Sequence, residues 1–567
     1  MSTKRNSDAF LAASAHWAKR AKHNDSNNDN SKPQKTPEII EISSGEESEE
    51  PEVHTGSTNI NSPSSTPTKS APSPSLRLLY APSYPENDLV RVNKDTVRIG
   101  DLVGSEDLSE TYQFNFSVDL GFFFSFLHPK FITDKRKIMF ITGSKLLDPS
   151  NEDTELIKRQ YNISEVTADI PNRFGTHHTK MMINFFKDGS MEVVIMTANL
   201  RKIDFGGLTQ AVWNSGRLQK KESKTKIPLR GERFQRDLMN YMKRYNKSEV
   251  SKLAERLKDY DFSPVTVELI GSTPGSYDLS EMTDESDIYG YGKLYQALKR
   301  NSLLLDNSAT NDHKTYNVLA QVSAISYPFS VEKWATAGIF SHLLCPLIFS
   351  QKEPFKLLEP GSGSFRDHQR KHNYCPSIVY PTAAEVASST IGFDAGQAIH
   401  FNYTQSFVHK NYYNQAIKPY LRKCNSSGKN KEITGREILM PHIKMYMCDN
   451  GDNWSSLRWV YTGSHNLSKQ AWGSRKGNKF TSDDPSKYEI SSYELGVLVF
   501  PEEGKKLVPV YLNHDNIADK ESTEIPIRMP FKLPPVKYSS NDLPWSYHVS
   551  YGDSLKDKYG ETFNVNK

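Results

Sequence analysis

The chain has 567 residues, a formal net charge of +4 at pH 7 and 36% hydrophobic residues. A single hydrophobic core rarely extends past about 250–300 residues, so this length excludes a one-core protein and fits about two globular domains with tails. The nearly balanced charge excludes recognition of a polyanion through bulk charge, so a nucleic-acid site has to be made by local groups.

The spacing of the cysteines and the length of the apolar runs exclude two further classes of protein, those built on disulfides or zinc and those that span a membrane. None of Cys345, Cys375, Cys424 and Cys448 has a C-x-x-C partner, which argues against a disulfide framework or zinc knuckle and favours reduced thiols inside a cell. No apolar run approaches the roughly 18 residues needed to cross a bilayer, and the amino terminus is not a secretory signal. We therefore expect a soluble protein with no metal and no membrane partner.

Residues 1–76 form the first predicted segment, a disordered regulatory tail. Ser, Asn, Asp, Pro and Glu dominate from 24 to 75, and the apolar surface is too small to offset the entropy of ordering the chain. The basic residues at 4–5 and 19–22 resemble a nuclear-import sequence, which predicts a nuclear location. The alternative is that 19–22 is only the basic end of a short helix.

A second signal in this tail is a short apolar run. Ile39, Ile40 and Ile42 precede acidic and phosphorylatable residues. This order resembles a SUMO-interacting motif, in which a short apolar strand extends the sheet of its partner and the acidic residues meet a basic rim. SUMO is therefore a candidate partner, although short patterns of this kind also recur by chance.

Beyond the tail, apolar patterns indicate globular domains. Runs at 137–143 and 191–197 predict buried strands. Apolar residues at three- and four-residue intervals between 233 and 260 predict amphipathic helices, and the strand that ends in a Gly-Ser-Thr-Pro-Gly turn at 271–275 marks a domain boundary. Helices mixed with short strands predict an α/β sandwich in each half. The expected domains are an N-terminal one over 77–276 and a C-terminal one over 277–567.

Two His-x-Lys pairs carry the functional signal. His178 and Lys180 lie in one hydrophobic run, and His442 and Lys444 lie in another. On a β-strand, positions i and i+2 point to the same face, so each imidazole would project beside its ammonium. A phosphodiester gains negative charge as it becomes five-coordinate, so two lysines suit its equatorial oxygens, and two imidazoles suit in-line attack and protonation of the leaving group.

The second half of the chain repeats the first in outline. Each His-x-Lys pair is followed, about twenty residues later, by a strand that ends near an asparagine, Asn199 in the first half and Asn466 in the second. This pattern predicts a diverged duplication. A pseudo-twofold axis would bring both His-Lys-Asn sets together at the interface between the domains, where ligand sites commonly lie.

These motifs resemble those of the phospholipase D superfamily, which normally also carry an Asp a few residues after the Lys. This chain has Phe185 and Asp449 five residues after its two motif lysines, and Asp449 has no counterpart in the first copy. The His-Lys-Asn variant looks like the tyrosyl-DNA phosphodiesterase family. Within a likeness that spans roughly 78–551, the further matching blocks are 174–182, 209–213, 271–275, 466–473 and 492–498.

The resemblance implies a fold, a reaction and partners. The fold is two phospholipase D-like α/β/α sandwich domains related by a pseudo-twofold. The reaction is hydrolysis of the 3′-phosphotyrosyl bond between DNA and a stalled type IB topoisomerase peptide, which serves DNA repair. Other groups that block DNA 3′ ends are further candidate substrates. The partners are single-stranded or duplex DNA 3′ ends and the topoisomerase remnant. We expect a monomer, because one duplicated chain can build the whole site.

The same resemblance implies roles for the site residues. His178 attacks phosphorus and forms a phosphohistidine, and His442 protonates the departing phenolate and then activates water. The nonbridging oxygens are held by side chains in place of a metal, so no cofactor is expected. The residues that hold these oxygens are Lys180, Lys444, Asn199 and Asn466.

Gln210 and Glu494 each orient one histidine, by the same resemblance. We expect Glu494 near His178 and Gln210 near His442, each across the domain interface. A carboxylate raises the basicity of an imidazole, whereas a neutral amide leaves the acid freer to give up its proton. This difference would give the two imidazoles opposite protonation states at the start of the reaction.

DNA binding is expected at a second group of residues. Phe174 is a candidate for stacking on a base, and Ser323, Ser326, Ser468 and Lys469 match places where the family grips a single-stranded backbone. Such contacts give binding with little sequence preference. The alternatives are a core position for Phe174 and plain turn positions for Ser323 and Ser326.

Two other functions remain open from the sequence. A lipid phosphodiesterase would use the same chemistry, but no lipid-binding module or amphipathic anchor is visible. A non-catalytic scaffold that binds DNA ends or SUMO is the other alternative, and two intact motifs argue against it. Hydrolysis of a 3′-phosphotyrosyl oligonucleotide or of phosphatidylcholine would separate the three functions.

Overall fold

A computed structural model describes most of the chain beyond the tail. The described stretches are 76–147, 152–222, 225–280, 282–305, 314–326, 369–370, 372–425, 433–475, 487–514 and 523–565. All of them belong to one compact unit. The predicted disordered tail, with its nuclear-import sequence and its SUMO-interacting motif, lies outside the described residues.

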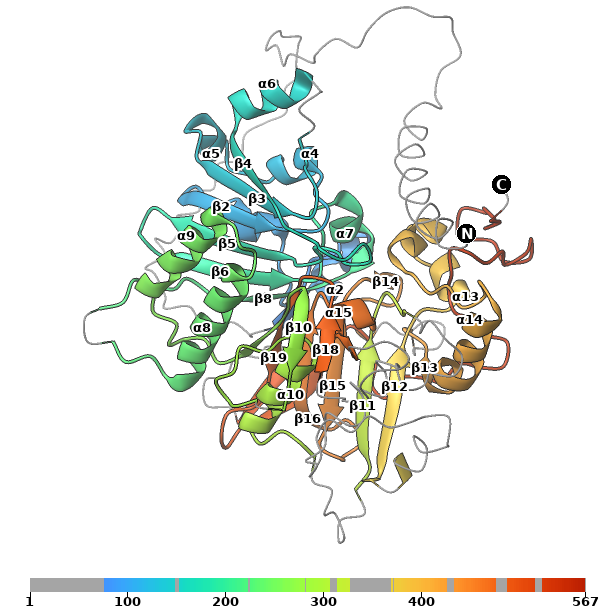
Figure 1. Ribbon diagram of the computed structural model, residues 1–567. Coiled ribbons are helices and arrows are strands. Elements are labelled where there is room, and N and C mark those ends of the chain that lie inside the picture. The colour runs from blue at the N-terminus through green and yellow to red at the C-terminus, as the bar shows by residue number, and fades with distance from the viewer. Residues whose placement is uncertain are drawn as a thin grey trace, which may run out of the picture. The chain divides into compact units, whose positions relative to one another are not determined.

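A first sheet occupies the N-terminal half of the described chain (Figure 1). Its strands are β1 Leu76–Leu78, β2 Leu108–Phe114, β3 Lys137–Thr142, β4 Asn162–Thr167, β5 Met181–Phe186, β6 Met191–Met196 and β8 Ala211–Asn214. Their spatial order is β1-β8-β6-β5-β2-β3-β4. The neighbours β2, β3 and β4 run parallel, and the other neighbouring strands run antiparallel. The strands predicted at 137–143 and 191–197 are therefore confirmed as β3 and β6.

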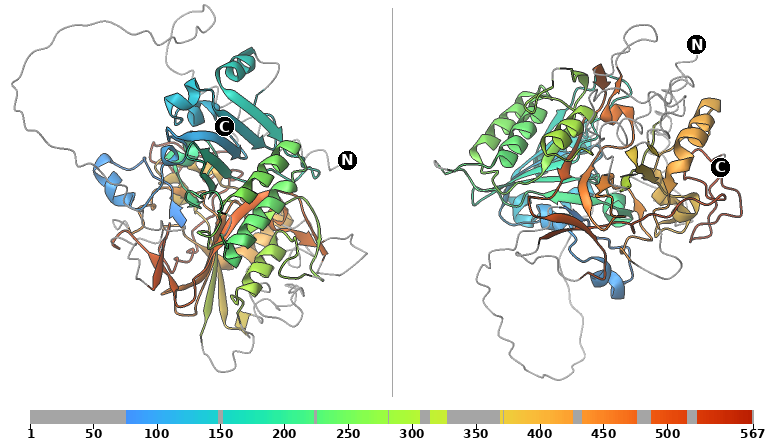
Figure 2. Two further views of the ribbon diagram at one scale, coloured as in Figure 1. Left: turned by 90° about the vertical axis from the view of Figure 1, so that its left-hand side faces the viewer. Right: turned by 90° about the horizontal axis from the view of Figure 1, so that it is seen from below.

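Helices cover both faces of this sheet, and the side chains of its central strands are therefore buried on both sides. In β5, Met181 and Ile183 pack in one core cluster, and Met182 packs in another, as the alternation of side chains along a strand requires. The first cluster includes α8 Leu229–Lys243 and α9 Ser248–Arg256; the second includes α3 Ile99–Val103, α4 Leu120–Phe124 and α5 Pro129–Thr133. The green helices α8 and α9 lie side by side in each view (Figures 1 and 2). This half is an α/β/α sandwich, and the helices predicted between 233 and 260 are confirmed.

A second sheet is built from the C-terminal half. Its strands are β9 Glu268–Ser272, β11 Tyr316–Gln321, β12 Tyr374–Val379, β13 Leu421–Arg422, β15 Met445–Asp449, β16 Leu457–Gly463, β19 Glu494–Val499, β20 Lys506–Val510 and β21 Glu524–Arg528. The main order is β13-β12-β11-β15-β16-β19-β9, and β20 and β21 extend it from β16.

The two sheets correspond strand by strand, which confirms the predicted duplication. The order β4-β3-β2-β5-β6-β8-β1 in the first sheet matches β13-β12-β11-β15-β16-β19-β9 in the second. The directions match as well, because β11, β12 and β13 run parallel to one another and the following pairs, from β11·β15 onward, run antiparallel. The strands that follow the two His-x-Lys pairs, β5 and β15, hold equivalent central places.

The strand β9 connects the two halves. It precedes the boundary predicted after residue 276, yet it pairs antiparallel with β19 and belongs to the second sheet. It is also the structural counterpart of β1, the strand that begins the described chain. The domain limits themselves stay a prediction.

Short backbone ladders join the halves. Strand β14 Met440–Pro441 pairs parallel with β7 Leu208–Thr209, and an isolated bridge joins His177 to Tyr493. The first ladder comes just before one His-x-Lys pair, and the second lies beside the other. Both pairs are therefore placed by main-chain bonds to the opposite half.

The remaining elements surround this framework. They are α2 Glu86–Val92, α6 Glu152–Gln160, α7 Lys202–Gly206, α10 Tyr291–Arg300, α13 Ala383–Ala387, α14 Phe407–Tyr412, α15 Lys469–Trp472, the turns of helix η1 Leu257–Asp259, η4 Gly392–Ala398, η5 Tyr413–Ile417 and η6 Lys418–Tyr420, and a small sheet of β10 Gly275–Asp278, β17 Ser474–Arg475 and β18 Lys487–Ile490. Among the helices that the structure describes, none is both long enough and apolar enough to span a membrane.

Candidate active site

Main-chain bonds from the opposite half place both histidines. The His178 amide donates to the Tyr493 carbonyl at 2.9 Å, and the His442 amide donates to the Thr209 carbonyl at 3.0 Å. The expectation that the His-x-Lys pairs lie within strands is wrong, because β5 and β15 begin only after the lysines. In the segments that hold the pairs, the histidine amides bond across the interface between the halves, whereas the Lys180 and Lys444 carbonyls accept from the Met196 and Gly463 amides of their own half.

Both lysines lie in the protein interior. Lys180 and Lys444 are each 0% exposed. Each ammonium turns back to its own motif, since Lys180 Nζ donates to the His178 carbonyl at 2.8 Å and Lys444 Nζ donates to the His442 carbonyl. The two copies of the motif therefore share one local arrangement, in which the ammonium binds the main-chain carbonyl of the motif histidine.

Each histidine ring binds a side chain of the opposite half. His178 Nδ1 is 2.8 Å from Glu494 Oε2, and Gln210 Nε2 is 2.9 Å from His442 Nδ1. The structure thus places both pairs as the resemblance implied. Glu494 and Gln210 directly follow Tyr493 and Thr209, so the same short segment fixes the backbone of a histidine and its ring. Because each contact uses Nδ1, the Nε2 atom of each ring is on the side away from that contact.

The two asparagines lie beside these pairs. Asn466 Oδ1 accepts hydrogen bonds from the Ser323 and Ala324 amides at 3.2 and 2.9 Å. Its amino group therefore faces the opposite way, where it is able to donate. Asn199 is 7% exposed, and its Nδ2 lies 3.2 Å from Asp204 Oδ1.

Burial sets the charges of the site. Burial lowers the pKa of Lys180 to about 8, against the opposing charges of Glu494 and Asp204. Burial, followed by the charge of Lys180, holds the pKa of Lys444 well below its ordinary value. Two ammoniums in a low-dielectric interior favour binding of an anion, because an anion supplies the charge that lost hydration no longer screens.

The histidines and Glu494 respond to the same environment. Burial, and then the lysine charges, hold the pKa of His178 well below its ordinary value. Burial lowers the pKa of His442 to about 3, and Lys444 acts in the same direction. Burial raises the pKa of Glu494 to about 7. Without an anion, the site therefore favours neutral imidazoles.

Sequence reasoning missed Asp204. This residue lies in α7 and is 2% exposed, and its Oδ1 is 3.2 Å from His442 Nδ1. Burial alone would raise the pKa of Asp204, but its hydrogen bond with His442 lowers that pKa overall. The expected contrast between a carboxylate on His178 and only an amide on His442 is therefore incomplete, since a carboxylate faces each ring. Apart from its place between Asn199 and Gln210, Asp204 carries no sequence signal.

Asp449, five residues after Lys444, has a structural environment. Its carboxylate accepts from the Asn317 amide and from Asn317 Nδ2, both at 2.7 Å, and from the Gly451 and Trp454 amides at 3.1 Å. It stabilises the turn after β15, and no hydrogen bond joins it to the candidate catalytic residues that the structure describes.

The expected DNA contacts occupy different environments. Phe174 is 46% exposed, and the Arg173 guanidinium lies 4.6 Å from its ring centroid, so the core alternative is wrong. Ser323 is 1% exposed, and its hydroxyl donates to Asn466 at 3.3 Å. Ser468 caps α15 by accepting from the Ala471 amide at 3.2 Å.

The two other predicted contacts, Ser326 and Lys469, lie at or beside the segment that follows Asn466 in the chain. The Ser326 amide donates to the Leu467 carbonyl at 3.0 Å. Lys469, the first residue of α15, has a pKa that burial lowers to about 8. The backbone therefore brings Ser323, Ser326, Ser468 and Lys469 around Asn466.

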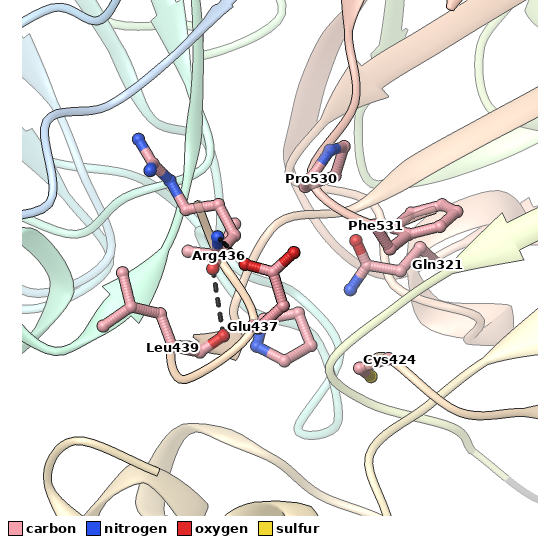
Figure 3. Close-up of a pocket in the computed structure, with 9 residues that line it drawn as sticks. Gln321, Cys424, Arg436, Glu437, Leu439, Pro530 and Phe531 are labelled. Atoms are coloured by element: carbon pink, nitrogen blue, oxygen red, sulfur yellow. Dashed lines mark hydrogen bonds between the residues drawn. The ribbon is translucent and has the colours of Figure 1, made fainter. Parts of the chain in front are cut away.

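A small pocket lies beside β14 (Figure 3). It is lined by Thr209 and Pro441 and by side chains that include Gln321, Cys424 and Glu437. None of the eight candidate catalytic residues lines it. Among the described residues, no group of three or more His, Cys, Asp and Glu side chains has the arrangement of a metal site.

The chain is similar to tyrosyl-DNA phosphodiesterases. A family model with that description matches residues 76–539. A probable tyrosyl-DNA phosphodiesterase of Schizosaccharomyces pombe is 28% identical over 531 residues, which cover 82% of this chain and 91% of that protein. Tyrosyl-DNA phosphodiesterase 1 of Drosophila melanogaster is 28% identical over 450 residues, which cover 77% and 68%.

A solved structure has the same fold. The crystal structure of the yeast tyrosyl-DNA phosphodiesterase matches with a TM-score of 0.61 and 20% sequence identity, over 83% of this chain and 98% of that one. Together with the paired sheets, this match confirms the predicted fold class of two α/β/α sandwich domains.

Proposed function

This chain belongs to the tyrosyl-DNA phosphodiesterase family, and on that premise we propose that it hydrolyses the 3′-phosphotyrosyl bond between DNA and a type IB topoisomerase peptide. The main support is that the two His-x-Lys pairs lie within reach of each other's charges, and that each histidine ring is held through Nδ1 by a side chain of the opposite half. Two imidazoles and two buried ammoniums suit a phosphodiester that changes its charge during reaction.

In the first step, His178 Nε2 attacks phosphorus. The P–N bond forms as the bond from phosphorus to the tyrosine oxygen breaks, and the electron pair of that bond leaves with the phenolate. His442 gives its Nε2 proton to the phenolate oxygen. The products are a free tyrosyl peptide and a phosphohistidine that links His178 to the DNA 3′ end.

In the second step, His442 works as a base. It takes a proton from water, whose oxygen attacks phosphorus, and the P–N bond to His178 breaks. DNA leaves with a 3′-phosphate, and both rings return to their first states. Other groups attached to a 3′-phosphate meet the same chemistry, so we include 3′ blocking groups among the substrates.

Four side chains stabilise the five-coordinate phosphorus. Lys180 and Lys444 compensate the negative charge of the equatorial oxygens, and Asn199 and Asn466 donate to the same oxygens. The buried position of both lysines strengthens this interaction, since there is little water to screen it. This set of donors supplies the charge that a metal supplies in other phosphodiesterases.

The DNA strand extends away from this centre. Phe174 is accessible for stacking on a base, and Ser323, Ser326, Ser468 and Lys469 follow the sugar-phosphate backbone. Stacking and phosphate contacts do not read base edges, so binding should have little sequence preference. We also propose that the enzyme acts as a monomer, because one duplicated chain can build the whole site. On the tail motifs alone, we propose that it acts in the nucleus and that its tail binds SUMO.

A cleavage assay in EDTA tests the proposal. A labelled single-stranded oligonucleotide with a 3′-phosphotyrosine should yield a 3′-phosphate, and phosphatidylcholine should remain intact. His178→Ala should abolish cleavage. His514→Ala is the matched control, because His514 is an exposed histidine whose ring accepts from the Tyr511 amide at 3.0 Å. Full activity of His178→Ala, or release of choline or phosphatidate, would reject the proposal.

A further inference from the structure

We propose that Asp204 is a positioning residue that holds the proton of His442 on Nδ1, and so keeps this ring competent as acid in one step and as base in the next. This inference rests on the proposed function. Asp204 is not part of either His-x-Lys motif. It reaches His442 from the opposite half, in the same way as Glu494 reaches His178.

A single carboxylate oxygen connects three of the candidate site residues. Asp204 Oδ1 accepts from the Asn199 amide at 2.9 Å and from Gln210 Nε2 at 3.0 Å, and it is 3.2 Å from His442 Nδ1. The side chain of Asp204 is 3% exposed and that of His442 is 7% exposed. Water therefore screens this charge poorly.

The orientation of the Gln210 amide is fixed by Thr197. The Ala211 amide donates to Thr197 Oγ1 at 2.9 Å, and Thr197 Oγ1 donates to Gln210 Oε1 at 2.6 Å. The carbonyl end of Gln210 is thus occupied. Its amino end faces Asp204 and His442 and is only able to donate.

This arrangement decides which forms of His442 are stable. The general acid must be an imidazolium, which carries hydrogen on both ring nitrogens. Its Nδ1–H needs an acceptor, and Gln210 offers none on that side. Among the residues that the structure describes around this nitrogen, Asp204 is the acceptor. The charged form of His442 therefore depends on the Asp204 carboxylate.

The base in the second step has the same requirement. A neutral imidazole takes a proton from water at Nε2 only if its hydrogen is on Nδ1. Donation by Gln210 to Nδ1 favours the opposite tautomer, in which Nε2 is already protonated. Asp204 favours the useful tautomer, because it accepts the Nδ1 hydrogen.

The charged neighbours of His442 act in opposite directions. Lys444 and Lys180 disfavour the imidazolium, and Asp204 favours it. A bound phosphodiester adds negative charge beside the lysines and reduces their effect. Asp204 would then favour proton uptake by His442 once the substrate is in place.

The variant Asp204→Asn tests this role without removing the side chain. An amide has nearly the same shape and keeps one oxygen that accepts from the Asn199 amide and Gln210, but it lacks the charge. Two substrates separate the outcomes, a 3′-phosphotyrosyl oligonucleotide and a 3′-(p-nitrophenyl) phosphodiester, whose more acidic phenol departs with less help. General acid catalysis contributes roughly 10²–10⁴-fold.

We expect single-turnover cleavage of the phosphotyrosyl bond to fall about 100-fold or more, and that of the nitrophenyl ester to fall less than about 10-fold. The limb of the pH–rate profile that reports protonation of His442 should move to lower pH. The phosphohistidine should accumulate with the nitrophenyl ester, because the base is impaired. Equal losses on both substrates with an unchanged pH profile would overturn the inference.

Asp449→Asn is the matched control. It also removes a buried charge, but Asp449 binds Asn317 and turn amides, so the ratio of the two rates should not change. Failure of the wild-type protein on both substrates would reject the proposed function rather than the role of Asp204.

A direct measurement on the wild-type protein covers the case in which Asp204→Asn does not fold. In the presence of vanadate, a mimic of five-coordinate phosphorus, ¹⁵N NMR of labelled histidines should show a protonated Nδ1 in His442. The signal is assigned to His442 by its absence from the spectrum of the His442→Gln variant. An unprotonated Nδ1 that accepts a hydrogen bond would overturn the inference.

Discussion

Glu494 binds the ring of the proposed nucleophile, and burial raises the pKa of its carboxyl to about 7. The charged form of Glu494 is therefore costly until a positive partner appears beside it. A phosphohistidine at His178 is such a partner, since its ring carries a positive charge. At the residue scale, the site is organised for charges that exist only during reaction.

Glu494→Gln should slow the first step by roughly 100-fold, because the amide does not stabilise the cationic ring as it forms. Single-turnover cleavage of the phosphotyrosyl oligonucleotide measures this step. The control is Glu502→Gln, because Glu502 is a partly exposed glutamate that pairs with Lys505. An unchanged single-turnover rate in Glu494→Gln would exclude a role for the Glu494 charge.

His442→Asn should accumulate the phosphohistidine. A phenol is a fairly good leaving group, so the first step continues slowly, whereas the second step loses the group that activates water. A labelled DNA should then remain bound to the protein on a denaturing gel. If neither an adduct nor a burst is seen while the substrate still binds, the two-step scheme is wrong.

Elements of one half place residues of the other. The segment before β5 lies against the segment before β19, and Gly175 shows how closely they approach. A Cβ on Gly175 would overlap the Ser491 carbonyl oxygen. The position therefore accepts no side chain unless the segment that carries His178 moves.

Gly175→Ala should lower both activity and stability. We expect a loss of about 1–3 kcal/mol in the free energy of unfolding, as for other overpacked sites, and about 100-fold in the single-turnover rate, because His178 shifts relative to phosphorus. Denaturant unfolding and cleavage measure the two effects. Gly100→Ala is the control, because a Cβ there meets no atom within 4 Å. Normal activity of Gly175→Ala would show that the segment adjusts freely.

At the scale of the whole molecule, buried histidines link folding to pH. Burial lowers the pKa of His177, His442 and His465 to about 3 each. The unfolded chain binds protons at these residues below about pH 6.5, and the folded chain does not until about pH 3. Their effect on stability is therefore fully favourable above pH 6.5 and is lost progressively as the pH falls.

The free energy of unfolding should fall between pH 6.5 and pH 4. Each of the three histidines contributes up to roughly 2 kcal/mol of this loss at pH 5. Glu494 acts in the opposite direction between about pH 4.5 and 7, because its folded pKa is raised, but three groups outweigh one. Urea unfolding at pH 7, 6, 5 and 4 measures the trend, and a constant stability across this range would contradict it.

Some of the fold followed from local sequence and some did not. Apolar runs located β3 and β6, and the intervals between 233 and 260 located α8 and α9, because burial patterns of strands and helices are local properties. The membership of β9 in the second sheet was not visible, since the apolar pattern of a strand does not identify its neighbour. The same reason explains the wrong placement of the His-x-Lys pairs within strands.

The repeated His-x-Lys and Asn motifs are short and chemically distinctive, so the candidate reacting groups could be predicted before any fold was known. Which side chains meet them became visible only in the folded molecule. Gln210 and His442 are separated by 232 positions in the chain, and the Asp204 carboxylate joins them only when β7 pairs with β14. Contacts of this kind depend on how two folded halves pack, and no spacing along one polypeptide encodes that geometry in a readable form.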